Sequence, residues 1–321
     1  MHDASRGAMP LAPVHAAAVP PQAAAKRATV EVWIPGEDGG LDSIAQKTGG
    51  AVSTDPIVAA AYANGVKVLE YVKREFGRSS FDGRGGTLKL RVHAPDPSTG
   101  EKNANNAYWF DDEQRIWLGD GDGVMFAPLG NADDVMAHEF FHGVIDSEVK
   151  LRYVGQEGAL HESFADVLAT GVDGNWQIAE KVFTPHITGD ALRDLSRLTN
   201  KDWRTFPTWN DEVHDMSEIP SHAAYLVGSK LGMPLMRQVW YTALTDHLRS
   251  NSGFAGARDA TIAAARVLYG ATSTQAQAVV DAWTAVGIDA TTPKERPYVA
   301  APFQSTLAAA LVQPHAPRHL F

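Results

Sequence analysis

The chain has 321 residues, of which 44% are hydrophobic and 21% are charged, and it contains no cysteine. This composition is typical of a globular protein with room for two domains, and it excludes disulfides and thiolate chemistry. The formal net charge is −10, without a basic stripe interleaved with aromatic residues, so we expect no nucleic-acid partner. No apolar run reaches the roughly 18 residues that a membrane helix needs, so we expect no membrane partner.

The N-terminal part begins with residues 1–27, which are rich in alanine and proline. We interpret them as a flexible leader, with a degenerate secretion signal as the alternative. Apolar and polar residues alternate over 27–33, which predicts a strand, whereas 35–54 is rich in turn-forming residues. Residues 57–76 carry apolar side chains at helical spacing, and Gly65 falls on the same face, where it indicates a close contact with another element.

The rest of the chain alternates between short strands and longer helices. Strands are predicted over 87–93 and within 107–118. Five prolines after residue 291 indicate a tail that adds little to the core, although 306–312 is apolar enough to form a short packed segment. Apolar residues at three- and four-residue steps predict helices over 131–146, 157–170, 233–248, 255–269 and 273–286.

One motif carries chemistry. Residues 138–142 read His-Glu-Phe-Phe-His, so His138 and His142 lie one helical turn apart and can bind one zinc ion, leaving Glu139 to act on a water. On the next predicted helix, Glu162 and Asp166 share one face. Glu162 would be the third ligand, leaving a fourth position open as in catalytic sites, and Asp166 would orient a histidine ring. The alternative is two buried helices whose polar groups pair with one another.

Further segments flank this motif in a characteristic order, and with them the chain resembles the thermolysin-like neutral metallopeptidases, the gluzincin family whose third zinc ligand is a glutamate. The likeness covers about residues 55–287. The segments that carry it are Asn105–Trp109, Gly119–Gly123, Phe126–Leu129, Tyr153, Phe183–Arg193, Val213–His214, His222–Leu226 and Asp281–Gly287.

The resemblance implies an α+β, two-lobed fold, with a β-rich N-terminal lobe, a mainly α-helical C-terminal lobe and the zinc helix at their junction. We therefore expect four parts. They are a leader (1–27), a β-rich lobe that includes the zinc helix (28–146), a helical catalytic lobe (147–290) and a tail (291–321).

The implied activity is zinc-dependent hydrolysis of internal peptide bonds on the N-terminal side of bulky hydrophobic residues. Glu139 would be the general base, and Tyr153 and His214 would donate hydrogen bonds to the oxyanion. By the same resemblance, substrate would be bound by Asn106, Ala107, Trp109 and Arg193, and its apolar side chain by Phe126, Leu129, Val135, Val182 and Leu192. A catalytically silent zinc-binding relative is one alternative. A zinc aminopeptidase is another, although no Gly-x-Met-Glu-Asn segment is present.

The chain departs from the family pattern at several positions. Trp209 stands where the family has an aspartate that orients the catalytic histidine, and Asp211 is the nearby candidate to replace it. The residue before Glu162 is His161 instead of asparagine. The departures around His214 leave its orientation open and motivate the silent-relative hypothesis.

Calcium binding is expected to be reduced. Asn175 and Gln177 occupy acidic positions of the family's paired-calcium site, so that site should be weak or absent, because calcium affinity follows the number of carboxylates. A single-calcium loop at Thr184, Ile187 and Asp190 keeps the pattern better. The resemblance also implies peptide or protein substrates, a monomer and an extracellular location, with a cytoplasmic location or non-classical export as alternatives. Either end of the chain could restrain the enzyme until it is trimmed.

Overall fold

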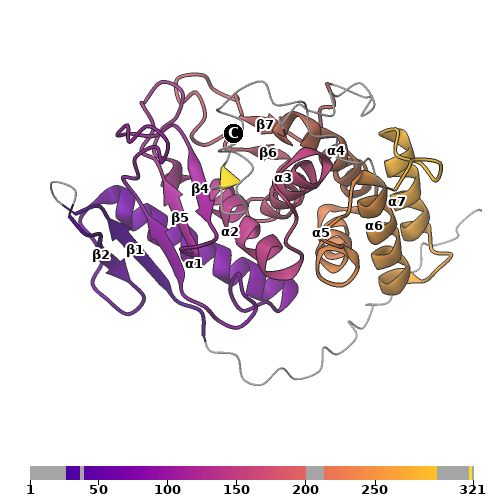
Figure 1. The fold of residues 1–321 in the computed structure, drawn as a ribbon, viewed down its shortest axis with the longest axis horizontal. Coiled ribbons are helices and arrows are strands. Elements are labelled where there is room, and N and C mark those ends of the chain that lie inside the picture. The colour runs from indigo at the N-terminus through magenta and orange to yellow at the C-terminus, as the bar shows by residue number, and fades with distance from the viewer. Residues whose placement is uncertain (1–26, 37–39, 200–212, 295–317, 320–321) are drawn as a thin grey trace, which may run out of the picture.

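The computed structural model describes residues 27–36, 40–199, 213–294 and 318–319. The N-terminal part contains a six-stranded sheet, and the C-terminal part is helical (Figure 1). The strand order is β2-β1-β3-β5-β4-β8, in which β1, β3 and β5 run parallel and the other neighbours antiparallel. The strands are β1 (Val30–Ile34), β2 (Ser43–Lys47), β3 (Leu88–Arg91), β4 (Ala107–Phe110), β5 (Arg115–Leu118) and β8 (Arg318–His319).

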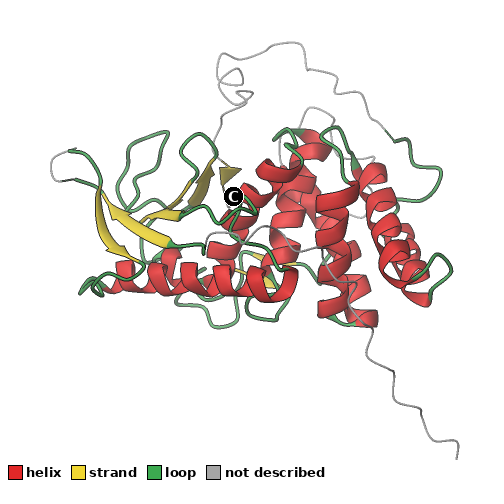
Figure 2. Cartoon of the chain, turned by 90° about the horizontal axis from the view of Figure 1, so that it is seen from below, coloured by secondary structure: helices red, strands yellow, loops and turns green. Residues whose placement is uncertain are grey.

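The helices divide into one that supports the sheet and a group that forms the second part. Seen from below, α1 runs along the sheet, and the later helices pack together at the other end of the molecule (Figure 2). A small pair, β6 (Gln177–Ile178) and β7 (Arg193–Asp194), lies beside them. The helices are α1 (Pro56–Phe76), α2 (Asp133–Glu148), α3 (Gly155–Ala169), α4 (Val213–Leu231), α5 (Met233–Thr242), α6 (Phe254–Tyr269) and α7 (Thr274–Ala285).

Helix α1 has clear start and stop signals in the sequence. The carboxylate of Asp55 accepts hydrogen bonds from the first backbone N–H groups, and Gly77 ends the helix with a left-handed φ of 67°. A Cβ atom at Gly65 would lie 3.0 Å from a methyl group of Leu90 and 3.2 Å from one of Val30. Glycine therefore lets the helix approach the sheet closely, which confirms the predicted contact.

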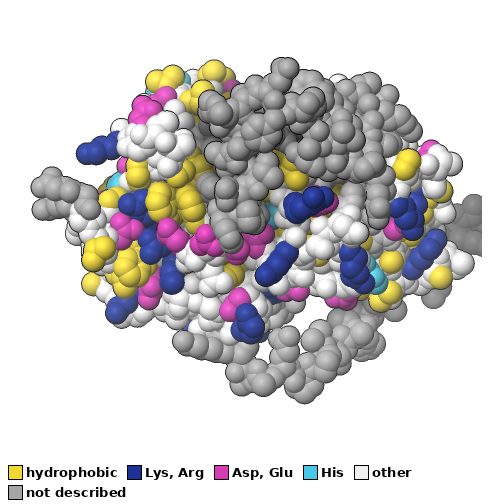
Figure 3. Space-filling view, in the orientation of Figure 1, with side chains coloured by type: hydrophobic (Ala, Val, Ile, Leu, Met, Phe, Trp, Pro, Cys, Tyr) yellow, Lys and Arg dark blue, Asp and Glu magenta, His cyan; other side chains and the backbone are white. Residues whose placement is uncertain are grey.

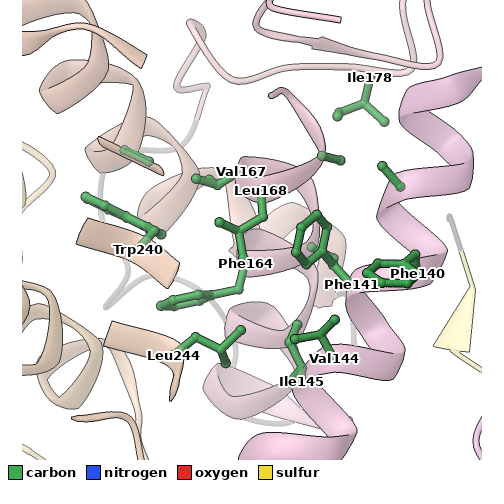
Figure 4. Packing of buried hydrophobic residues seen from close by; sticks show 14 of the residues in the cluster. Phe140, Phe141, Val144, Ile145, Phe164, Val167, Leu168, Ile178, Trp240 and Leu244 are labelled. Carbon is green, nitrogen blue, oxygen red and sulfur yellow. The ribbon is translucent and has the colours of Figure 1, made fainter. Parts of the chain in front are cut away.

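Helix α2 lies at the centre of the molecule. Its residues Asp133–Asp146 are all buried, as expected of a helix covered on every side. Helices α1 and α3 and strand β4 pack against it, and Figure 4 shows the apolar side chains between α2 and α3. The residues labelled in this core are Phe140, Phe141, Val144 and Ile145 from α2, Phe164, Val167 and Leu168 from α3, and Ile178, Trp240 and Leu244.

The fold class is confirmed, but three local predictions need correction. The turn-rich segment 35–54 contains strand β2, whose mostly exposed residues give little hydrophobic alternation. The helix predicted over 233–248 ends as α5 at Thr242 and continues as a π-helical turn, Ala243–His247. The tail supplies β8, which only its pairing with β4 could indicate. Residues 306–312 lie outside the described ranges, and the boundaries of the four predicted parts stay a prediction.

The surface and the helix lengths bear on the expected partners. On the face shown in Figure 3, basic and acidic side chains are interspersed over the described residues. In the described ranges, no helix is both long enough and apolar enough to span a membrane.

Candidate metal centre and active site

The packing of α2 on α3 brings the three predicted zinc ligands together. His138 and His142 project from the same face of α2, and Glu162 projects from α3; all three are fully buried. One ligand atom from each residue lies within 4.8 Å of the other two. Two imidazole nitrogens and one carboxylate oxygen form a typical donor set of catalytic zinc, and together they provide three ligands and leave a fourth position for water.

The hydrogen bonding of this cluster fits a cation. His138 Nε2 and Glu162 Oε2 face each other at 3.3 Å without forming a hydrogen bond. Both carboxylate oxygens of Glu139 also lack a hydrogen-bond partner among the described residues. Buried polar atoms are nearly always satisfied, so such a group of unsatisfied atoms indicates a missing ligand. Burial raises the pKa of Glu139 to about 8, and a nearby positive charge would oppose that shift.

A carboxylate behind His138 holds its ring. Asp166 Oδ1 lies 2.8 Å from His138 Nδ1, which leaves Nε2 directed at Glu162. Burial lowers the pKa of His138, but the carboxylates of Asp166 and Glu162 outweigh this and raise it to about 10. Asp166 also accepts two hydrogen bonds of 2.7 Å from the guanidinium of Arg193 on β7. The predicted orienting carboxylate thus connects the cluster to the predicted substrate-binding arginine.

A second chain of hydrogen bonds lies behind His142. Its Nδ1 is 2.8 Å from Nδ1 of His161, and Nε2 of His161 is 3.0 Å from Oδ1 of Asp146. All three residues are buried. The sequence analysis recorded His161 only as a departure from the family and did not include Asp146. The available signal was that Asp146 follows His142 by four residues and so shares its helix face.

Tyr153 and His214 also converge on the third ligand. The hydroxyl of Tyr153 donates to Glu162 Oε1 and lies 3.4 Å from Nε2 of His214, which is itself 3.3 Å from Glu162 Oε2. Close packing of α4 on α3 allows this, since a Cβ atom at Gly158 would lie only 2.6 Å from Val213. Two groups capable of donating hydrogen bonds therefore flank the ligand cluster.

Strand β4 forms another wall of the site. The side chain of Trp109 is buried; it packs against Gly143 of α2 and donates to Asp146 over 3.1 Å. Ala107 is also buried, and its backbone N–H donates to the side-chain oxygen of Asn106. The predicted contribution of Trp109 to substrate binding is thus restricted to its backbone.

Comparison with known proteins identifies the family. Two family sequence models match, "Thermolysin metallopeptidase, catalytic domain" over residues 37–146 and "Thermolysin metallopeptidase, alpha-helical domain" over 149–288. Neutral protease NprE of Bacillus pumilus is 39% identical over 262 residues, which are 78% of this chain and 83% of that protein. The chain belongs to the thermolysin metallopeptidase family. The predicted family is therefore confirmed.

Two further comparisons agree with this assignment. Extracellular elastase of Staphylococcus epidermidis is 39% identical over 237 residues, 69% of this chain and 44% of that protein. The precursor of protealysin from Serratia proteamaculans has the same fold, with a TM-score of 0.72, 27% identity, and coverage of 83% of this chain and 89% of that one. The chain spans about half the length of most of the curated relatives it matches.

The remaining predicted residues of the thermolysin-family site are placed as follows. Leu192 is partly buried and, with Asp166, Arg193 and His214, lines a pocket of about 440 Å³. The other four predicted pocket residues are at most 1% exposed and do not line this pocket. These four are Phe126, Leu129, Val135 and Val182. Asp211 lies outside the described residues.

The predicted single-calcium loop is closed by its own hydrogen bonds. Thr184 donates through its hydroxyl to Asp190 over 2.7 Å, and the backbone N–H of Ile187 donates to the carbonyl of Thr184 over 2.7 Å. Calcium binding at this loop stays a prediction.

An acidic cluster at the start of α2 is already paired with lysines. Asp133, Asp134 and Asp173 bring carboxylate oxygens within 4.8 Å of one another. Lys181 contacts both Asp133 and Asp173, the latter at 2.9 Å, and Lys67 contacts Asp133. Asp134 is different, because burial and neighbouring carboxylates raise its pKa to about 7. The ammonium groups neutralise much of the charge that a cation would otherwise balance.

Proposed function

We propose that this chain is a zinc-dependent endopeptidase that hydrolyses internal peptide bonds on the N-terminal side of bulky hydrophobic residues. One observation carries the proposal. Three buried zinc-type ligands, His138, His142 and Glu162, converge beside Glu139, whose two carboxylate oxygens have no hydrogen-bond partner among the described residues. A buried carboxylate beside an open metal position is the arrangement needed to activate water.

The proposed chemistry divides between the metal and the chain. Zinc held by the three ligands would act as a Lewis acid toward the scissile carbonyl and an attacking water. Glu139 takes the proton from that water as the water attacks the carbonyl carbon, and then delivers it to the amine that leaves. Asp166 keeps the ring of His138 in place throughout this cycle, because its carboxylate lies 2.8 Å from His138 Nδ1.

Charge that develops on the carbonyl oxygen is met by two donors. The hydroxyl of Tyr153 and Nε2 of His214 lie 3.4 Å apart on the Glu162 side of the cluster, and both would donate hydrogen bonds to this oxygen. Losing one such donor typically costs ~3–4 kcal/mol of transition-state stabilisation. Arg193, fixed by its paired hydrogen bonds to Asp166, would bind a backbone carbonyl of the substrate.

The preference for bulky apolar residues rests on the pocket beside the site. Leu192 lines this pocket of about 440 Å³, and Arg193 and His214 border it. The apolar part of its lining is Ala191, Leu192 and Leu195, and the rest is polar or charged. The proposed preference therefore depends on Leu192, which would contact the apolar side chain that follows the cut bond, next to the arginine that holds the peptide backbone. Asn106 and Ala107 would guide the peptide along β4 by backbone pairing.

The test compares three zinc-loaded proteins. Glu139→Gln should keep zinc and lose casein hydrolysis, because glutamine has the size of glutamate but cannot accept the proton. Glu70→Gln makes the same chemical change at an exposed site on α1 and should leave activity unchanged. Mass spectrometry of the digest should place cuts before Leu, Phe, Ile or Val. Cuts clustered after Lys or Arg would refute the specificity, and a zinc-saturated parent that cuts nothing would favour the silent relative.

Other properties follow as part of the same proposal. Its partners would be peptides or proteins, and the chain would act as a monomer. The relative from Staphylococcus epidermidis is named an extracellular elastase, which supports an extracellular location for this chain. Calcium would bind at the loop of Thr184, Ile187 and Asp190.

A further inference from the structure

The edge of the sheet beside the metal centre is covered by a distant part of the same chain. Strand β8 (Arg318–His319) pairs antiparallel with β4, with Trp109 opposite Arg318 and Tyr108 opposite His319. Figure 1 and Figure 2 both place this strand, near the mark C, between the sheet and the helical part. In the strand order, β8 takes the outermost position, so β4 is not the free edge of the sheet.

The covered edge borders the proposed catalytic groups. The side chain of Trp109 packs on Gly143, in the helix that carries His138 and Glu139. Burial, the hydrogen bond to Asp96 and the charges of Asp96 and Glu139 raise the pKa of Tyr108, which places β4 within electrostatic range of Glu139. Strand β8 itself lies against α2. A peptide lying along β4 would therefore run past the metal centre.

An extended peptide and β8 need the same backbone groups. Strand β4 has four residues, and β8 pairs with the middle two. The other side of β4 is already paired with β5. A substrate that adds a strand to a sheet edge uses the unpaired N–H and C=O groups of that edge. Successive residues of a strand direct these groups to opposite sides, and the bond from Gly119 N–H to the Asn106 carbonyl shows that Asn106 and Tyr108 face β5. The N–H and C=O groups of Trp109 therefore face β8, where Arg318 is the paired residue, so the two occupants exclude each other.

We propose that the segment Arg318–His319 is an intramolecular competitor that occupies the peptide-binding edge of β4 by strand addition. This inference rests on the proposed function, because it assumes that substrate binds along β4. The pairing is short, so it delays substrate without blocking it permanently. One or two net hydrogen bonds correspond to a change of about three- to thirty-fold in an equilibrium. Because competitor and edge belong to one chain, the competition is independent of protein concentration.

The test removes the backbone donors of β8 together with its side chains in one variant, and the side chains alone in a second. The variant Arg318→Pro/His319→Pro loses both side chains and both backbone N–H groups. The variant Arg318→Ala/His319→Ala loses the same side chains but keeps both backbone N–H groups. Hydrogen–deuterium exchange over residues 107–110 should be faster in the proline variant than in the parent, with the alanine variant close to the parent. In zinc-loaded protein, the KM for an internally quenched peptide should fall about three- to thirty-fold in the proline variant, with kcat unchanged.

The outcomes separate this inference from the proposed function. Equal exchange and equal KM in the proline and alanine variants would overturn the competitor, and so would an alanine variant that changes as much as the proline one. If no zinc-loaded variant cleaves any peptide, the proposed endopeptidase function fails and the competition fails with it, while exchange still reports whether β8 covers β4. Equal midpoints of thermal unfolding in all three proteins would verify that the variants are folded.

Discussion

Replacing His161 with alanine should weaken zinc binding, although His161 is not one of the three proposed ligands. Its ring connects Nδ1 of His142, 2.8 Å away, to the carboxylate of Asp146, 3.0 Å away. To present Nε2 to a metal, His142 must keep a proton on Nδ1 and donate it to an acceptor. His161 supplies that acceptor, and Asp146 fixes its tautomer by accepting from the opposite nitrogen.

The magnitude follows from burial. His142 and His161 have no exposed surface and Asp146 is 7% exposed, so no water replaces the lost acceptor without cost. An unsatisfied buried donor costs about 1–3 kcal/mol. Outer-shell partners of metal-bound histidines typically contribute ~10–100-fold in metal affinity, which is about 1.4–2.8 kcal/mol. The two estimates agree, so we expect the zinc Kd to rise about 10–100-fold.

The assay is a zinc titration in competition with a chromophoric chelator. His161→Asn is the informative second variant, because an amide can accept from His142 and donate to Asp146, and its loss should be smaller than that of alanine. His222→Ala is the matched control, since His222 bonds the carbonyl of Leu195 and is not part of this chain of hydrogen bonds. A zinc Kd for His161→Ala within about twofold of the parent would refute the reasoning.

Three further predictions concern stability. Gly143→Ala would place a Cβ atom 2.8 Å from the Trp109 ring, so urea unfolding should show a loss of about 1–3 kcal/mol, and an unchanged midpoint would contradict the packing. Because the folded pKa of Asp134 is raised to about 7 from 3.8, its contribution to stability falls as the pH rises through that window. Asp134→Asn should therefore become more stable relative to the parent between pH 4 and 8. At Asp133 the folded pKa is lowered below 3.8, so its contribution is complete above that pH, and Asp133→Asn should be less stable than the parent by a constant amount between about pH 5 and 8. Lys181→Gln should lower the melting temperature at low calcium, as measured by calorimetry. Adding calcium should then raise the melting temperature of this variant more than that of the parent, because the acidic cluster has lost a positive charge. An equal rise in both proteins would argue against this.

Local sequence patterns determined most of the helices and the core of the candidate metal site. The spacing of His138 and His142 is one helical turn, so any helix over these residues directs both rings the same way, whatever surrounds it. The same holds for Glu162 and Asp166 on α3. The close approach at Gly65 was also predicted, because helical spacing places this glycine on the buried face of its helix, whereas its partners Leu90 and Val30 came only from the fold.

Tertiary structure decided the features that join distant residues. The sequence contains Asp146 and His161 but not their distance, which depends on how α2 crosses α3. The lysines that fill the acidic cluster come from α1 and from a loop, and neither has a local signal. Strand β8 is too short to show a periodicity in the sequence. It forms by pairing with the outer edge of β4, some 200 residues earlier in the printed sequence. Periodicity indicates which face of a segment is buried. Which residues that face contacts depends on the packing of the whole chain.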